Sequence, residues 1–164
     1  MSFEKDKLQQ ALKAAFDEFI NTFSAFDESQ INTRSAPGQW TPGQVATHII
    51  LATDGVPDHS TRAADREGDL FLPRIRPWWE DLSQKFKAPK ELTPDDRPTT
   101  RKFILDELDR VRAKDEKIIN TEDLSLICMD FELPGIGYLT RYEWLWFIEM
   151  HLKRHTFQLK NMSK

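Results

Sequence analysis

Apolar residues recur at three- and four-residue steps in four stretches of the chain, which is the spacing of amphipathic helices. The pattern predicts helices over 3–26, from Thr41 to Gly55 or Pro57, from Thr99 or Thr100 to Asn120, and from Thr140 to about Met162. Two starts carry capping signals: Thr41 precedes a proline at the first helical position, and Thr140 forms a capping box with Glu143. Because no segment alternates as a strand does, we expect an all-α four-helix bundle formed by one domain over 1–164.

The connections between these helices differ in length. About 40 residues, 58–98, separate the second and third helices, far more than packed neighbours usually need. We expect a short helix from about Trp78 to Lys85 within this connection. Two further segments, 27–40 and 123–138, contain turn-forming residues and are predicted to be loops. Asp115 interrupts the apolar face of the third helix, and we expect it at a solvent-exposed, fraying end rather than beside a polar pocket.

Composition narrows the class of protein. Hydrophobic residues make up 39% of the chain, too many for a disordered protein, and the net charge of −4 disfavours binding to nucleic acid. The longest apolar stretches are far shorter than the ~20 residues of a membrane span. The first ten residues lack the apolar run of a signal peptide, and the lone Cys128 has no partner for an internal disulfide. These features favour a cytoplasmic location and exclude a membrane partner.

Three of the four histidines fall on the inward faces of predicted helices. His151 and His155 are four residues apart, so both side chains lie on one helix face and can reach one ion. His48, on the second helix, is the one inward-facing candidate for a third imidazole ligand. Two interpretations remain open at this point: a three-histidine metal site with an open position, or three hydrogen-bonded rings in the core. The fourth, His59, is expected at the surface or at the rim of a pocket.

Other residues near these histidines have candidate roles. Gln158 lies one turn beyond His155 and can orient its ring, or it is simply exposed. Glu149 points away from His151 around the helix, so we do not assign it as a general base. Cys128 lacks an activating motif and is expected to be buried and inert.

The tryptophans allow two interpretations, either pocket walls or plain core. We favour core for three of them: Trp40, Trp144 and Trp146. Trp78 and Trp79 lie in the irregular connection, where they can cover a substrate pocket or bury a dimer interface.

Two segments of the chain resemble the DinB-like superfamily, which includes bacterial metal-dependent hydrolases and thiol S-transferases. Residues 40–49 are similar to the family's tryptophan, helix cap, short spacer and histidine. Residues 149–158 contain an HxxxH pair followed three residues later by glutamine, and 86–94 look like the linker before the family's third helix. The resemblance extends over nearly the whole chain. One departure is Gln44, where some relatives have glutamate.

The resemblance implies an up-down-down-up bundle with a long connection between the second and third helices, often assembled as a homodimer. It also implies that His48, His151 and His155 bind a divalent metal ion, with nickel or zinc the leading candidates. A thiol S-transferase or a hydrolase acting on a small thiol or an electrophilic molecule is the expected activity. The alternative is a metal-carrying or dimerising bundle without catalysis.

Overall fold

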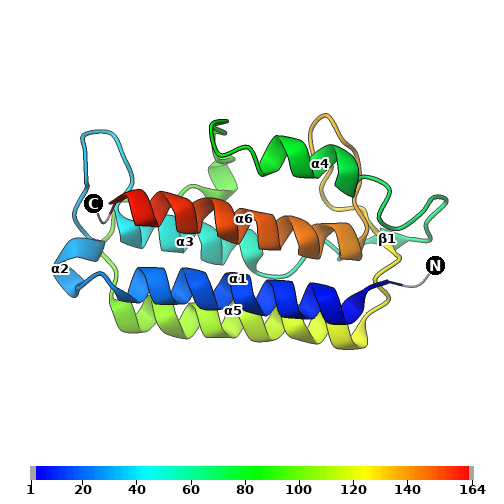
Figure 1. The fold of residues 1–164 in the computed structure, drawn as a ribbon, viewed down its shortest axis with the longest axis horizontal. Helices are drawn as coiled ribbons and strands as arrows, with labels where there is room; N and C mark the ends of the chain where they lie inside the picture. Colours follow the sequence, from blue (N-terminus) through cyan, green and yellow to red (C-terminus); the bar gives the residue numbers. More distant parts are fainter. Residues whose placement is uncertain (1–2, 163–164) are drawn as a thin grey trace.

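A computed structural model describes residues 3–162 of the protein, and helices dominate it (Figure 1). The elements in chain order are α1 (Lys5–Ser24), α2 (Glu28–Ile31), α3 (Pro42–Thr53), β1 (Thr61–Arg62), α4 (Leu72–Trp79), the 3-10 turn η1 (Lys90–Leu92), α5 (Arg101–Thr121), β2 (Ile127–Cys128) and α6 (Arg141–Met162). The predicted all-α fold is therefore confirmed. The four long helices correspond to the four predicted ones, with ends that differ by a few residues.

The four long helices pack as a bundle in which each contacts two neighbours. Helix α1 packs against α5 and α6, and α3 packs against the same two helices from the other side. Following the colours of Figure 1, α1 and α6 run in one direction and α3 and α5 in the other. This order is up-down-down-up, and it requires a long crossing connection between the parallel neighbours α3 and α5. Among the described residues, no helix combines the length and apolar character needed to cross a membrane.

Aromatic and aliphatic side chains from the inner faces fill the bundle. The largest fully buried ones include Phe16, Phe19, Phe23, Leu8, Leu12, Ile49, Ile104, Leu108 and Ile119. Along α1 and α5 the buried residues recur at three- and four-residue steps, so burial of one face accounts for the association of these helices with the bundle.

Hydrogen-bonding side chains fix the start of α6, as its sequence predicted. The Thr140 hydroxyl accepts from the Glu143 backbone N–H at 3.1 Å, and Glu143 accepts from the Thr140 N–H at 2.9 Å. The Glu143 carboxylate is fully buried, and Arg66 donates to both of its oxygens at 2.9 Å. The Phe71 N–H also donates to Glu143, so the capping residue ties the connection before α4 to the bundle.

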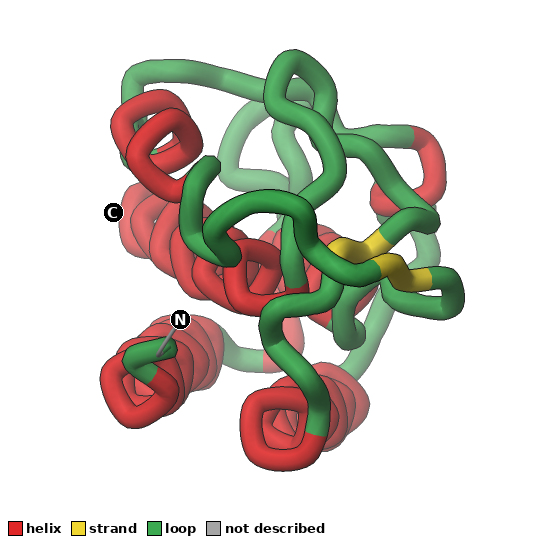
Figure 2. Tube along the Cα trace, turned by 90° about the vertical axis from the view of Figure 1, so that its right-hand side faces the viewer, coloured by secondary structure: helices red, strands yellow, loops and turns green. Residues whose placement is uncertain are grey.

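Several local predictions were wrong, because a local signal was missed or a distant segment decides the conformation. The segment 27–40 contains the helical turn α2, which Asp27 and Gln30 close as a capping box. The short helix α4 ends at Trp79 instead of beginning near it, because a proline at position 73 favours a start there. Strands β1 and β2 form a two-residue antiparallel ribbon beside the end of the bundle (Figure 2), a pairing that neither segment signals by itself.

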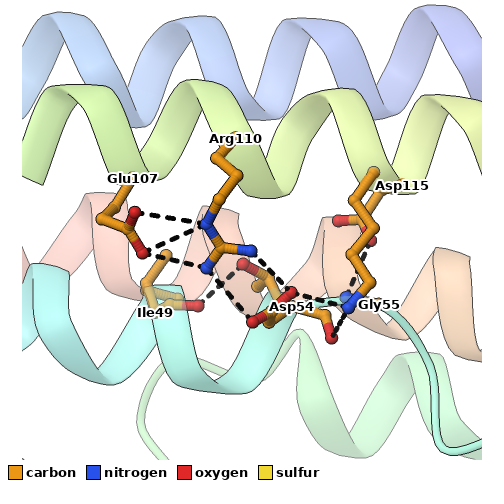
Figure 3. A network of polar contacts seen from close by, with 8 residues as sticks. Ile49, Asp54, Gly55, Glu107, Arg110 and Asp115 are labelled. Atoms are coloured by element: carbon orange, nitrogen blue, oxygen red, sulfur yellow. Dashed lines mark hydrogen bonds and ion pairs between the residues drawn. The ribbon is translucent and has the colours of Figure 1, made fainter.

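The prediction of an exposed Asp115 was also wrong, because its side chain is fully buried. The backbone turns at Gly55, where φ is 77°, and the Gly55 N–H donates to Asp115 Oδ1 at 3.1 Å. Beside this contact, Asp54 at the end of α3 pairs with Arg110 and Lys114 of α5 (Figure 3). Polar contacts therefore connect the end of α3 to α5.

Candidate metal centre

The structure brings His48, His151 and His155 together between α3 and α6. One nitrogen from each ring lies within 4.8 Å of the others, and the Nε2 atoms of His48 and His151 are 3.1 Å apart. Among the residues that the structure describes, this is the one cluster of three or more side chains able to hold a metal ion. Adjacent turns of α6 supply two rings, and α3 supplies the third because its histidine lies on the face that packs against α6.

Hydrogen bonds orient two of the three imidazoles. His48 Nδ1 lies 2.8 Å from the Leu92 carbonyl oxygen, which can only accept, so Nδ1 carries the proton and the unprotonated Nε2 faces His151 Nε2. His155 Nδ1 lies 2.7 Å from Gln158 Oε1, which fixes the same tautomer. The orienting role considered for Gln158 is therefore the one observed. Both rings present Nε2, the atom that a metal ion would need.

Burial keeps these imidazoles neutral. Desolvation lowers the pKa of His48 and lowers that of His155 to about 3. The pKa of His151 falls well below its usual value, first because the ring is buried and then because the other two histidines are close. Since only an unprotonated imidazole nitrogen can coordinate a metal, the three rings hold the protonation state that a metal site requires.

One pair of these nitrogens already has the spacing that a shared ion requires. Two nitrogens each about 2.0–2.1 Å from a metal, at angles between octahedral and tetrahedral, lie about 2.9–3.4 Å apart. The 3.1 Å between His48 and His151 falls in that interval. No aspartate, glutamate or cysteine among residues 3–162 joins the cluster. A bound ion would thus have three protein ligands and at least one coordination position open to water or substrate.

Aromatic side chains surround the cluster. The Trp40 ring centroid lies 5.2 Å from that of His48, and Trp79 contacts His151 edge-on at 5.4 Å. Phe147 lies one turn before His151 on α6, with 5.8 Å between the two ring centroids. His48 and His151 are buried, whereas His155 is partly exposed, so the cluster meets solvent on the His155 side. Aromatic rings therefore pack on the two buried histidines of the cluster.

The sequence identified only part of these surroundings. Trp40 lies at the site although we favoured plain core for it, whereas the other two favoured as core, Trp144 and Trp146, are buried. The i, i+4 spacing of Phe147 and His151 is a signal that could have revealed Phe147. Nothing local marks Leu92, whose backbone carbonyl comes from a 3-10 turn in the long connection.

The other candidate residues lie outside the cluster. His59 is exposed, as expected, and Glu149 is buried in an ion pair with Lys153 at 2.6 Å. Cys128 is also buried, and desolvation raises the pKa of its thiol to about 12. A thiol with so high a pKa is a poor nucleophile near neutral pH. None of these three side chains supplies a ligand or an activated nucleophile to the centre.

Comparison with known proteins gives one match that covers most of the chain. The sequence model described as the DinB superfamily matches residues 11–159, which include all three histidines and all four long helices except the outermost residues. Comparisons with curated proteins and with solved structures gave no match.

Proposed function

Because the chain belongs to the DinB superfamily, we propose that it is a metal-dependent enzyme whose reaction takes place at His48, His151 and His155. The observation that carries the proposal is the convergence of three neutral imidazoles, two of them held by hydrogen bonds, with no fourth protein ligand among residues 3–162. A structural site is normally closed by four protein ligands, whereas a catalytic site keeps a position for water or substrate.

The side chains around the cluster would divide the work of such a site. The Leu92 carbonyl and Gln158 hold two ligand rings in one tautomer, which spares the site from reordering them when an ion binds. Trp40, Trp79 and Phe147 limit the water around it. When bound, a divalent ion such as nickel or zinc would lower the pKa of a thiol or water at the open position.

Between the two reaction types, transfer of a small thiol to an electrophile fits the residues better than hydrolysis. A coordinated thiol loses its proton on binding and is then a nucleophile without further help. Hydrolysis commonly uses a carboxylate to move a proton from water, and no carboxylate of the described residues belongs to the cluster. The competing proposal is a bundle that carries metal without catalysis.

The first experiment measures metal stoichiometry by elemental analysis after exchange of untagged protein into nickel, zinc or manganese. We expect about one ion per chain for wild type and loss of that ion in His151→Ala and His155→Ala. His59→Ala is the matched control, because His59 is the one histidine outside the cluster. Wild-type protein without metal, or loss of metal in the control alone, would contradict the proposed centre.

The second experiment tests for catalysis in the loaded protein. Small thiols are incubated with an electrophile, and formation of the thioether is followed by mass spectrometry. We expect turnover that depends on the metal and disappears in His155→Ala. Stoichiometric metal binding without thiol transfer or hydrolysis would favour the non-catalytic bundle instead.

A further inference from the structure

Arg154 lies between His151 and His155 in the sequence of α6, but it is not a member of the histidine cluster. Its guanidinium donates hydrogen bonds to three backbone carbonyls, one at the end of α4 and two in the segment after it. Nη1 donates to the Trp79 carbonyl at 2.7 Å and to that of Asp81 at 3.2 Å, and Nη2 donates to the Gln84 carbonyl. No carboxylate among residues 3–162 forms an ion pair with Arg154, so its hydrogen bonds are directed to this segment.

The same guanidinium packs on the aromatic side chains of the segment. It lies 4.7 Å from the Phe86 ring centroid and 5.1 Å from that of Trp79. The two rings stack on each other, with centroids 4.7 Å apart and an interplanar angle of 18°. Arg154 therefore holds both the backbone and the rings of residues 79–86, which we call the aromatic wall.

Trp79 connects this wall to the histidines. Its ring contacts His151 edge-on and packs on Phe147 at a centroid distance of 4.8 Å. The indole Nε1 is buried and has no hydrogen-bond partner among the described residues. No side-chain hydrogen bond therefore fixes the ring, and its position depends on packing and on the bond between Arg154 and the Trp79 carbonyl.

We propose that Arg154 is a positioning residue that holds the aromatic wall of residues 79–86 against the three-histidine cluster and so controls which molecules reach it. The planar guanidinium serves two purposes that lysine cannot combine, since it donates in several directions and stacks on rings. Beyond the buried Trp79, residues 80–86 belong to no helix or strand, and Leu82 and Phe86 are exposed. That limiting access matters for a reaction rests on the proposed function. That Arg154 holds the wall against the histidines does not.

The test measures access to the histidines in metal-free protein, so that it is independent of metal binding. Diethyl pyrocarbonate acylates neutral imidazoles, and peptide mass spectrometry gives a rate for each histidine. In Arg154→Ala we expect modification of His151, the histidine that Trp79 contacts, to rise about tenfold, equivalent to a loss of about 1.4 kcal/mol in the free energy that holds the wall in place. Arg154→Lys should behave much like Arg154→Ala, because lysine keeps the positive charge but lacks the planar guanidinium with its several donors.

Three internal comparisons make the result decisive. Arg74→Ala is the matched control, because Arg74 also donates to a backbone carbonyl and lies over an aromatic ring, but its partners Gly135 and Phe71 are outside residues 79–86. His59 is exposed and should react equally in every variant. Buried Cys128, probed with a maleimide, reports opening of the whole domain.

A rise confined to the cluster histidines of the Arg154 variants supports the proposal. Unchanged rates would overturn it, and so would a rise accompanied by Cys128 labelling, because Arg154 would then act on the stability of the whole fold. If the rise is confined to the cluster histidines but the wild-type protein binds no metal, the proposed function is contradicted and the role of Arg154 is not.

Discussion

At the scale of single residues, Asp115 makes stability depend on pH. Its carboxyl is buried, and desolvation raises its pKa to about 8 from 3.8. The folded protein therefore binds this proton more tightly than the unfolded chain, so stability is highest below about pH 4 for this group and falls as pH rises toward 8. We expect its contribution to fall by up to about 1.4 kcal/mol per pH unit in that interval.

Asp115→Asn should remove this dependence, because the amide keeps an oxygen that accepts from Gly55 and has no proton to lose. Urea unfolding at a series of pH values between 5 and 8 would give the free energy of unfolding for both proteins. Asp106→Asn is the control, since Asp106 lies on the same helix in an exposed ion pair. Parallel curves for wild type and Asp115→Asn would show that the buried carboxyl does not titrate in this range.

At the scale of elements, close packing of α3 against its neighbours leaves no room for a side chain at Gly43. A Cβ atom there would lie 2.8 Å from the Ile31 carbonyl oxygen and 2.8 Å from Thr99 Cγ2. Alanine favours helix over glycine by about 1 kcal/mol, yet the clash with backbone should outweigh it. We expect Gly43→Ala to lower the free energy of unfolding by about 1–3 kcal/mol, measured by urea denaturation.

The control for this prediction is Gln10→Ala on the exposed face of α1, where the change should stay within about 0.5 kcal/mol. If Gly43→Ala instead stabilises the protein, α3 can move away from α2 without cost. The position of His48, five residues further along α3, would then be less rigid than the packing indicates.

At the scale of the whole molecule, a metal ion would link α3 to α6 and stabilise the fold. Binding only to the folded state at a free concentration 1,000-fold above Kd contributes about 4 kcal/mol. For a chain of this size, that corresponds to a rise in Tm of about 10 °C. Thermal unfolding followed by circular dichroism, with and without nickel or zinc, would measure the shift, and a chelator should reverse it.

His48→Ala should lose most of this stabilisation, and His59→Ala should keep it. Because His48 is the one cluster ligand on α3, its removal also breaks the link between the two helices. An equal shift in both variants would place the bound ion elsewhere in the molecule.

The features that could be predicted from the sequence all depend on local signals. Helical spacing defined the four long helices and their buried faces, and the Thr41 and Thr140 caps marked two starts that hydrogen bonds confirm. These features depend on neighbours within about one helical turn, which the sequence displays directly. The same spacing put His151 and His155 on one face and made His48 their candidate partner, and the structure brings all three together.

Contacts between distant segments required the tertiary structure. The Leu92 carbonyl on His48, Arg154 holding residues 79–86, and Gly55 covering Asp115 each join residues far apart in the chain. The long connection has no regular period, so its sequence does not reveal which backbone groups face the cluster. The sequence by itself determined the helices and the histidines on their inner faces; the packing of the connection against α6 decided how those histidines are oriented and enclosed, because it depends on distances between segments that no local pattern records.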